Sequence, residues 1–503
     1  MKMSSQQPPR GKERWPDERS GPHFPYNKIK IVEARTLKFI AEGCGGELVS
    51  GSSNRMVTRF CTDSRVVQEG DLFIALAGEK FDAHSFIPQV IEKGAAAVVI
   101  EKERTVPNTK DCGVIAVDNT RRALGQLATT YRNDFDIPFI AVGGSNGKTT
   151  TKELIASVLR QKLPTLWSEA SFNNDIGVPL TLMRLDRTHK AAVLEVGTNH
   201  PGELPPLLHM IRPRHSVITS IGREHLEFFG SMDGVVREEG SLAEFLPANG
   251  RLFVNGESEW VKPIAKRCRA SVVKVGRVAN LSEIWGKAWS KEKHFCARNV
   301  RMSERGISFS VVTADEEFGG DYHTPLLGRH QVVNALLAIA VGAELGLTQR
   351  DIQQGLAECK PARMRMELWS AGGVQVLDDC YNANADSMLS ALETLAEFPT
   401  QGRRIAVLGD MAELGAFTEE SHQEVGRRAG ELKLSHLISV GKMAQVTTAA
   451  ARAAGLKTVE TFKTVSEAGE ALKVLVKPGD TVLLKASRAM KLETIADFLK
   501  GHH

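Results

Sequence analysis

Residues 143–150 read GGSNGKTT and lie between an apolar run at 137–142 and a stretch of helix-forming residues that starts near Lys152. A strand, a glycine-rich loop and a Lys-Thr pair that opens a helix form a cradle for phosphates, because glycines let backbone N–H groups point at the anion. Lys148 can reach the β- and γ-phosphates, and the Thr149 hydroxyl suits Mg²⁺. The loop predicts an α/β unit that binds ATP with Mg²⁺ through Gly144, Ser145, Asn146, Gly147, Lys148, Thr149 and Thr150.

The loop departs in one respect from the G-x-x-x-x-G-K-[ST] pattern. The first glycine of that pattern would fall at Val142, and Gly143 and Gly144 follow it directly. This departure points away from the small GTPases. A glycine turn before a helix needs no ligand, but it does not need Gly, Lys and Thr in succession either, so a nucleotide site is the favoured interpretation.

Length and charge set the class of protein. A chain of 503 residues is too long for one core and predicts two to four domains. With 42% hydrophobic and 25% charged residues, the composition is typical of an ordinary globular protein. The net charge is only +4, and basic residues are interleaved with acidic ones. We therefore expect no nucleic-acid partner and no membrane surface, and the favoured ligands are small anions.

The cysteines and the start of the chain indicate where the protein works. Seven cysteines are present without a C-x-x-C pair or an even-numbered framework, which predicts free thiols in a reducing, cytoplasmic compartment. Residues 1–27 are rich in Pro, Arg, Glu and Ser and lack an apolar segment, so we expect a disordered tail. No apolar run reaches the ~18 residues that a membrane span needs, which predicts no membrane insertion.

Alternating short apolar runs and helical stretches predict three α/β units in series, at 28–137, 138–358 and 359–503. The expected strands of the first unit are 72–76, 95–100 and 113–117, and those of the central unit include 191–196 and 216–221. Residues 250–325 are expected to form antiparallel strands at the edge of the central sheet, before a helix at 332–345. The strands expected in the third unit are 374–377, 405–408, 437–440 and 481–485.

Polar side chains follow the strands of the central unit. Glu195 ends one strand and His225 comes four residues after the next, and in a parallel sheet both ends lie at the same edge as the phosphate loop. Burying a carboxylate at the end of an apolar strand is unfavourable because the charge loses its water, and a bound Mg²⁺ would compensate for that loss. The alternatives are that Glu195 caps a helix or pairs with an arginine, and that His225 is a structural histidine.

Residues 231–246 have helical periodicity with Val235, Leu242 and Leu246 on one face, and Glu239 shares that face. A carboxylate on an apolar stripe is typical of a functional or metal-linked group, and a buried ion pair is the alternative.

These motifs together resemble the Mur ligase family of ATP-dependent peptide synthetases, over a region from about residue 30 to the end. The resemblance rests on TDSR at 62–65, GDLFIALAGEKFDAH at 70–84, the phosphate loop, FNNDIG at 172–177, GTNHPGE at 197–203, DDCYNAN at 378–384 and GDMAELG at 409–415. It implies a small UDP-sugar domain, a central ATPase domain with a parallel sheet, and a Rossmann-like third domain.

The resemblance also implies roles for individual residues. The catalytic residues are Lys148, His225 and Arg363, and the metal ligands are Thr149, Glu195, His225 and Glu239. His330 and Asn334 fall where the family contacts adenine, and Arg363 and Asp379 fall in the parts that close over ATP. Substrate contacts are implied for Ser64, Arg65, Asn173, Asn174, Asn382 and Asn384.

The third-unit motifs favour D-alanyl-D-alanine as the amine substrate and UDP-N-acetylmuramoyl-tripeptide as the carboxylate substrate, joined through an acyl phosphate by an enzyme that acts as a monomer. A sister ligase that adds a diamino acid to the dipeptide precursor is the alternative. TDSR at 62–65 speaks against a folylpolyglutamate-type synthetase, and a nucleotide switch would leave Arg363 and Asp379 without a purpose. Because the loop and Arg363 lie in different units, the third unit is expected to close about a hinge at 355–362.

One residue departs from the family pattern in its chemistry. Glu239 aligns with a lysine that the family commonly carbamylates to make a second Mg²⁺ ligand. A glutamate offers a permanent but shorter carboxylate, so we expect Glu239 to supply that charge directly and activity to be independent of bicarbonate.

Overall fold

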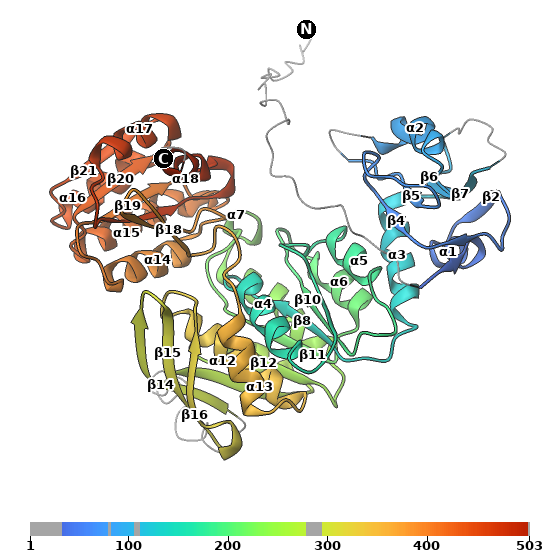
Figure 1. Ribbon diagram of the computed structural model, residues 1–503, viewed down its shortest axis with the longest axis horizontal. Coiled ribbons are helices and arrows are strands. Elements are labelled where there is room, and N and C mark those ends of the chain that lie inside the picture. Colours follow the sequence, from blue (N-terminus) through green and yellow to red (C-terminus); the bar gives the residue numbers. More distant parts are fainter. Residues whose placement is uncertain (1–32, 79–81, 105–110, 278–293, 501–503) are drawn as a thin grey trace, which may run out of the picture.

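The computed structural model describes residues 33–78, 82–104, 111–277 and 294–500, so the tail expected at 1–27 lies outside the described residues. The chain forms three α/β lobes, with the first and third lobes standing on opposite sides of the central one (Figure 1). Each lobe holds one main sheet, which confirms the predicted fold class. The boundaries near residues 137 and 358 stay predictions.

The first unit contains a five-stranded sheet in which only β2 runs antiparallel to its neighbour. Its order is β2 (Glu47–Ser50), β7 (Gly113–Val117), β6 (Ala97–Glu101), β5 (Leu72–Ile74) and β4 (Phe60–Cys61). A two-stranded ribbon, β1 (Arg35–Thr36) with β3 (Met56–Val57), lies beside it. The helices are α1 (Leu37–Gly43), α2 (Ile87–Glu92) and α3 (Thr120–Arg132). Helix α3 runs from this unit to the central one (Figure 1).

The central unit is built on a nine-stranded sheet that is parallel from β9 to β14. The order is β16 (Gly320–Thr324), β15 (Gly306–Thr313), β14 (His294–Ser303), β13 (Ser271–Arg277), β12 (Arg251–Asn255), β11 (His215–Ile218), β8 (Phe139–Gly143), β10 (Ala191–Glu195) and β9 (Thr165–Trp167). Its helices are α4 (Lys148–Leu159), α5 (Gly177–Leu182), α6 (Leu204–Ile211), α7 (Leu226–Phe229), α8 (Met232–Glu239), α9 (Ser241–Glu244), α10 (Val261–Arg267), α12 (Gln331–Glu344) and α13 (Gln349–Glu358).

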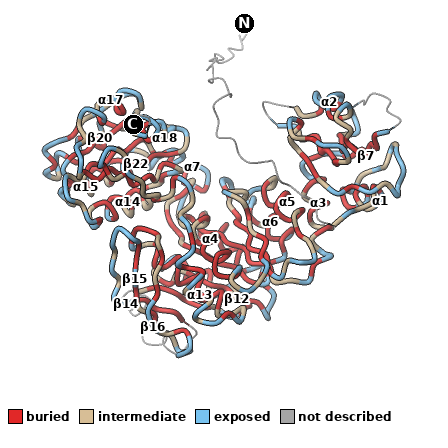
Figure 2. Tube along the Cα trace, viewed as in Figure 1, coloured by how far each residue is buried: buried red, intermediate tan, exposed pale blue. Residues whose placement is uncertain are grey.

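The apolar runs of this sheet are buried on both faces, as parallel strands between helices must be. In β8, Ile140 and Val142 join a core with α4 and α12, whereas Phe139 and Ala141 join a core on the other face. The second core continues into α3 through residues such as Leu127. The buried residues follow the strands in Figure 2. The first and central units therefore share one hydrophobic core.

Two expectations for the central unit need correction. Antiparallel pairing occurs only from β14 to β16, whereas β12 and β13 extend the parallel sheet. Helical periodicity between 231 and 246 predicted one helix, but the chain forms α8 and α9 with a break at Gly240. A Cβ at Gly240 would lie 2.9 Å from the carbonyl oxygen of Val236, so only glycine fits this crowded break.

The third unit has a six-stranded sheet with the order β17 (Glu367–Ala371), β18 (Val374–Asp378), β22 (Thr481–Lys485), β19 (Arg404–Gly409), β20 (His436–Val440) and β21 (Val459–Phe462). Only β17 runs antiparallel to its neighbour. Its helices are α14 (Ala385–Glu397), α15 (Thr418–Glu431), α16 (Ala444–Ala453), α17 (Val465–Leu475) and α18 (Glu493–Lys500). The four strands predicted for this unit are confirmed as β18, β19, β20 and β22.

All seven cysteines are free thiols, as predicted, and six of them are buried. In the part of the chain that the structure describes, no helix is both long and apolar enough to cross a membrane.

His215 at the start of β11 is buried, and its Nδ1 has no hydrogen-bond partner among the residues that the structure describes. Burial lowers the pKa of His215 from 6.5 to about 4. The unfolded chain therefore binds a proton in this range that the folded protein rejects, so stability should fall as pH drops from 6.5 through about 4. We expect His215→Phe to flatten this fall in urea unfolding midpoints. The exposed His209 provides the control, because His209→Gln should leave the pH profile unchanged.

Candidate active site

The phosphate loop joins β8 to α4 and depends on two glycines with left-handed backbones. Gly144 has φ 113° and Gly147 has φ 88°. A Cβ at Gly144 would lie 2.6 Å from Oγ1 of Thr219, and one at Gly147 would lie 2.8 Å from Oδ1 of Asn334. Larger residues at these positions would clash as well as strain the chain, so the loop conformation requires glycine. The four N-terminal N–H groups of α4 then face the space above the loop.

Residues that follow β11 hold the loop in place. The Ser145 N–H donates to the carbonyl of Ser220 at 2.8 Å, and the Asn146 N–H donates to the Ser220 hydroxyl at 2.8 Å. The Thr219 hydroxyl lies 2.6 Å from the carbonyl oxygen of Asn146. The loop is therefore fixed before any phosphate arrives, which spares the ordering cost on binding.

The Lys148 amine lies at the centre of the loop. It donates to the carbonyl of Gly144 at 2.5 Å and lies 3.3 Å from Oε2 of Glu224, a buried carboxylate. Burial acts to lower the pKa of this amine, but neighbouring carboxylates outweigh burial and raise it. These carboxylates belong to Glu224, Glu239 and Glu195. Lys148 is therefore positively charged in a site that is otherwise acidic.

Two carboxylates in this site each have an oxygen that accepts no hydrogen bond from the described residues. Glu195 ends β10 beside the loop, and Glu239 ends α8 with its Oε2 3.1 Å from where a Cβ of Gly143 would be. Both are 1% exposed, and within the described part of the chain nothing donates a hydrogen bond to Oε2 of either one. Burial first, then the charge of Glu224, raises the pKa of Glu239 to about 8. A bound cation would coordinate buried carboxylate oxygens of this kind.

The carboxylates do not form a ready-made cage. Within 33–78, 82–104, 111–277 and 294–500, no group of three His, Cys, Asp or Glu side chains is arranged to hold a metal ion. This arrangement suits Mg²⁺, which is commonly held by one or two carboxylates together with substrate phosphates and water.

Lys152 lies one turn after Lys148 and is completely buried. Its amine donates to the carbonyls of Ser168 and Ala170 at 2.7 and 2.6 Å and lies 3.8 Å from Oε2 of Glu195. On the other side, the Asn173 amide donates to Oε1 of Glu195 at 2.9 Å. Glu195 is therefore held between the loop helix and the 168–173 segment.

His225 contacts the third unit through its Nδ1. It begins α7 with φ 48°, and its Nδ1 lies 2.5 Å from Oε2 of Glu413, whose pKa falls mainly because of this hydrogen bond. Next to it, Arg223 pairs with Asp386 at 2.7 Å and with Glu424 at 2.6 Å. These pairs dock the third unit onto the segment that supports the phosphate loop.

The loop itself also contacts the third unit. The Asn384 amide donates to Oδ1 of Asn146 at 3.0 Å, and Asn384 caps α14 at the same time. Asn334, on α12, packs against Gly147 of the loop. Burial lowers the pKa of His330 to about 4, and the charges that act on its ring are those of Asp379 and Lys485 of the third unit. His330 and Asn334 thus lie at the junction of the two units.

The structure brings Arg365 to the site and leaves Arg363 exposed. The Arg365 guanidinium lies 4.1 Å from the Tyr381 ring centre and donates to the Ser171 hydroxyl at 3.4 Å. That hydroxyl is 3.5 Å from Oγ1 of Thr149. The residues on either side of Arg365 have left-handed backbones, with φ 58° and 51°, so a simple extended chain does not predict which side chain faces the loop.

The 378–384 segment forms a second polar network. Asp379 accepts from the Lys485 amine at 2.5 Å and from the backbone N–H of Met366 at 3.0 Å. The side-chain oxygen of Asn382 accepts from the backbone N–H of Ala383, and the backbone carbonyl of Asn382 accepts from the Lys485 amine at 3.1 Å. Cys380 lies within this network, and burial, followed by the charge of Asp378, raises its pKa well above the ordinary value.

The remaining candidate residues lie outside the loop. Ser64 and Arg65 are in the first unit, where Arg65 pairs with Asp63 at 2.7 Å and the carbonyl of Ser64 accepts from Lys93 at 2.7 Å. Asn174 accepts from the N–H of Gly177 at 2.8 Å and so supports the start of α5.

Sequence reasoning missed Glu224, Lys152, Arg365 and Glu413. Lys152 carried a signal, since it lies at i+4 from Lys148 and shares its helix face. Arg365 and Glu413 depend on contacts between units, and Glu224 depends on a contact between distant segments of the central unit. Spacing along the chain reveals neither kind of contact.

Comparisons with known proteins agree with this geometry. Family models match along the chain: the Mur ligase family, catalytic domain, at 57–132, the Mur ligase middle domain at 142–342, and the Mur ligase, glutamate ligase domain, at 364–488. The UDP-N-acetylmuramoyl-tripeptide–D-alanyl-D-alanine ligase of Escherichia coli is 35% identical over 92% of this chain and 98% of its own length.

Solved structures give the same picture. A crystal structure of MurF from Acinetobacter baumannii superposes with a TM-score of 0.83 at 30% identity, over 94% of this chain and 100% of the other. MurF ligase from Thermotoga maritima in complex with ADP gives a TM-score of 0.74 at 25% identity, over 88% and 97% of the two chains. The resemblance predicted from the motifs is confirmed, and the chain belongs to the Mur ligase family.

Proposed function

We propose that this chain ligates D-alanyl-D-alanine to the terminal carboxylate of UDP-N-acetylmuramoyl-tripeptide, driven by ATP, to give a pentapeptide precursor of peptidoglycan. The observation that carries the proposal is the near full-length similarity to ligases of that name, on a chain whose phosphate loop is already formed around Lys148. The sister reaction, addition of a diamino acid to the dipeptide precursor, is not favoured, because the relatives named here are D-alanyl-D-alanine ligases.

The chemistry needs two steps. The tripeptide carboxylate attacks the γ-phosphorus of ATP, ADP leaves, and an acyl phosphate forms. The amine of D-alanyl-D-alanine then attacks the acyl carbon, inorganic phosphate leaves, and the amine loses a proton. The first step brings two anions together, so Lys148 and Arg365 would offset negative charge as the phosphoryl group moves.

Mg²⁺ fits the donor set of this site. Thr149, Glu195 and Glu239 supply the hard oxygen ligands that Mg²⁺ prefers, and the orphaned Oε2 atoms of both carboxylates support the assignment. When bound with ATP, the ion would neutralise charge on the phosphates. His225 would be a further ligand through its Nε2, because Glu413 already holds its Nδ1 at 2.5 Å, as carboxylates do for metal-binding histidines.

Glu239→Gln is expected to weaken Mg²⁺ binding and to lower activity at limiting Mg²⁺ by about tenfold or more, because an amide keeps the size of the group but cannot release a proton to become an anionic ligand for the ion. Titration of Mn²⁺ as a spectroscopic substitute measures the binding without turnover. Wild-type activity should be the same with and without added bicarbonate. Unchanged metal affinity in the variant would refute the role of Glu239.

We assign the remaining contacts by their places in the fold. Ser64 and Arg65 of the first unit would bind the UDP-sugar, Asn173 and Asn174 would line the path of its peptide, and Asn382 and Asn384 would meet the incoming dipeptide. His330, Asn334 and Asp379 would surround the nucleotide where the central and third units meet. A hinge at 355–362, a monomeric state and action in the cytoplasm complete the proposal, and the free thiols fit a reducing compartment.

The proposed function is tested by phosphate release with ATP, Mg²⁺ and UDP-N-acetylmuramoyl-tripeptide, with D-alanyl-D-alanine or a single diamino acid as the amine. A parallel reaction uses the dipeptide acceptor with the diamino acid. We expect release only with tripeptide and D-alanyl-D-alanine together. Release only in the parallel reaction would assign the chain to the sister reaction, and release without an amine would make it a nucleotide hydrolase.

A further inference from the structure

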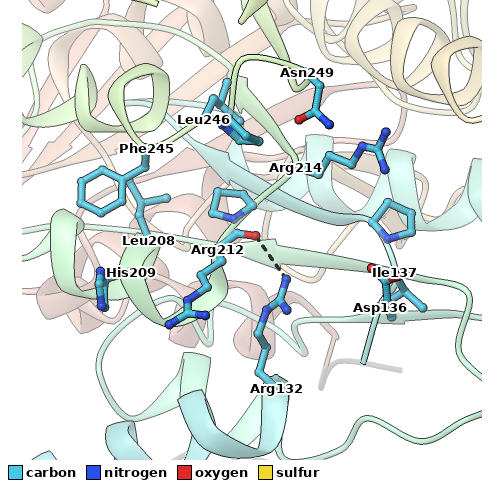
Figure 3. Close-up of a pocket in the computed structure, with 13 residues that line it drawn as sticks. Arg132, Asp136, Ile137, Leu208, His209, Arg212, Arg214, Phe245, Leu246 and Asn249 are labelled. Atoms are coloured by element: carbon cyan, nitrogen blue, oxygen red, sulfur yellow. Dashed lines mark hydrogen bonds between the residues drawn. The ribbon is translucent and has the colours of Figure 1, made fainter. Parts of the chain in front are cut away.

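A cavity of about 530 Å³ lies on the side of the central sheet away from the phosphate loop. It opens where α3 of the first unit ends, and the turns that precede β8, β11 and β12 enclose it (Figure 3). The phosphate loop follows the carboxyl end of β8, whereas this cavity lies at the amino ends of the same strands. A five-residue strand is about 17 Å long, so the two sites are separate.

Three arginines give the cavity a positive charge. Arg132 ends α3, and Arg212 and Arg214 lie in the turn between α6 and β11. Burial, and after it the charge of Arg212, lowers the pKa of Arg132 to about 10, so the first two guanidinium groups lie close enough to repel each other. In Figure 3, Arg132 and Arg212 lie on one side of the cavity and Arg214 on the other.

The partners of these arginines do not neutralise them. Arg132 donates to the backbone carbonyls of Ile211 and Arg212 at 2.7 and 3.2 Å, and Arg212 donates to the amide oxygen of Asn133 at 3.2 Å. Among the described residues, the carboxylate whose charge acts on Arg132 is that of Asp136, and its effect on the pKa of Arg132 is smaller than those of burial and of Arg212. Asp136 is the single acidic residue of the lining, so the cavity keeps excess positive charge.

The opposite part of the lining is apolar. Leu208 and Leu246 are buried, and Phe245 exposes 37% of its surface although it is a large hydrophobic residue. Cavities of roughly 300–1,000 Å³ with an apolar wall and a few convergent polar groups are typical of small-molecule sites. The arginines that line this space supply charge-assisted hydrogen-bond donors that suit the oxygens of a phosphate group.

We propose that this cavity binds a small phosphate-bearing molecule, with the phosphate between the arginines and an apolar or aromatic part against Phe245. Its walls come from the end of α3, the linker that enters β8 and the central unit. A bound ligand would therefore tie the first unit to the central unit at the point where they share a core. Such a ligand would bias the position of the UDP-sugar domain without entering the catalytic cleft.

The test is calorimetric titration of the full chain with phenyl phosphate and with inorganic phosphate, with the phosphate loop first saturated with ADP and Mg²⁺. We expect one site and tighter binding of phenyl phosphate. Arg212→Gln and Arg214→Gln should each weaken binding by about tenfold, because each removes a charge-assisted hydrogen bond. Arg132 is not the residue to replace, since it also packs 3.9 Å from the Phe139 ring and supports the fold.

Two further variants complete the test. Phe245→Ala should remove the preference for phenyl phosphate over inorganic phosphate and leave phosphate binding itself unchanged. Arg305→Gln, in the exposed turn between β14 and β15, is the matched control and should bind like the wild type. Absence of binding to the ADP-saturated protein at millimolar ligand, or equal weakening by Arg305→Gln, would overturn the proposal. Neither outcome affects the ligase assay, so the two proposals fail separately.

Discussion

Replacing Lys148 with methionine is expected to lower kcat for phosphate release by about 10²–10³-fold, the usual effect of removing one preorganised positive group from a transition state. Lys148 is the cation that the loop wraps, and three carboxylates surround it. Without it, Glu224 and Glu239 would face the phosphates with no lysine in the loop to oppose their charge. ADP binding should weaken as well, which equilibrium titration measures independently of turnover.

The matched control is Lys162→Met, which removes an exposed lysine just beyond the end of α4 and should leave both measurements unchanged. Circular dichroism and thermal unfolding establish that the Lys148 variant is folded. Full activity in a folded Lys148→Met protein would mean that the loop does not hold the reacting phosphates. The proposed mechanism would then be wrong at its first step.

Arg365→Gln is expected to lower kcat by a similar factor, about 10²–10³-fold, with a smaller change in KM, because the guanidinium acts on charge that develops as the phosphoryl group moves. Its side chain already reaches Ser171, whose hydroxyl lies beside Thr149 of the loop. Arg363→Gln is the natural comparison, because it changes the same type of residue two positions away on the exposed side. It should retain at least half of the activity.

This pair of variants separates two assignments. The family resemblance implies that Arg363 is the catalytic arginine, whereas the contacts in the structure favour Arg365. Activity lost in Arg363→Gln and kept in Arg365→Gln would restore the first assignment and would require the 363–366 turn to rearrange when the substrates bind. Steady-state kinetics at saturating ATP and UDP-N-acetylmuramoyl-tripeptide decides between them.

Local patterns predicted much of this molecule. The parallel strands appear as continuous apolar runs because both of their faces are buried, and β8 is the clearest example. The phosphate loop could be predicted down to single residues, since Gly144 and Gly147 need backbones that only glycine adopts easily. Glu195 was placed near the loop because parallel strands end at one edge of the sheet, and Glu239 because the family resemblance implies a metal ligand at that position.

What the sequence did not predict depends on contacts between distant segments. Glu224 pairs with Lys148 across 76 positions, and Arg223 pairs with Asp386 across 163. Neither pair produces a periodic pattern in the sequence. The prediction for the edge of the central sheet was wrong for another reason. The end residues of β12 and β13 are partly exposed, so their pattern resembles that of antiparallel edge strands. Break points such as Gly240 likewise follow from tertiary crowding.

The burial of Cys380 has a consequence for chemical probes of this enzyme. Its thiol lies in the 378–384 segment, close to where the substrates would meet, and would be an obvious target for covalent labelling. The nucleophile in such reactions is the thiolate, and burial with a neighbouring aspartate keeps this thiol protonated. Maleimides and acrylamides should therefore not react with this thiol in the folded protein. An irreversible inhibitor aimed at this cleft would need to form its covalent bond with a lysine or a carboxylate.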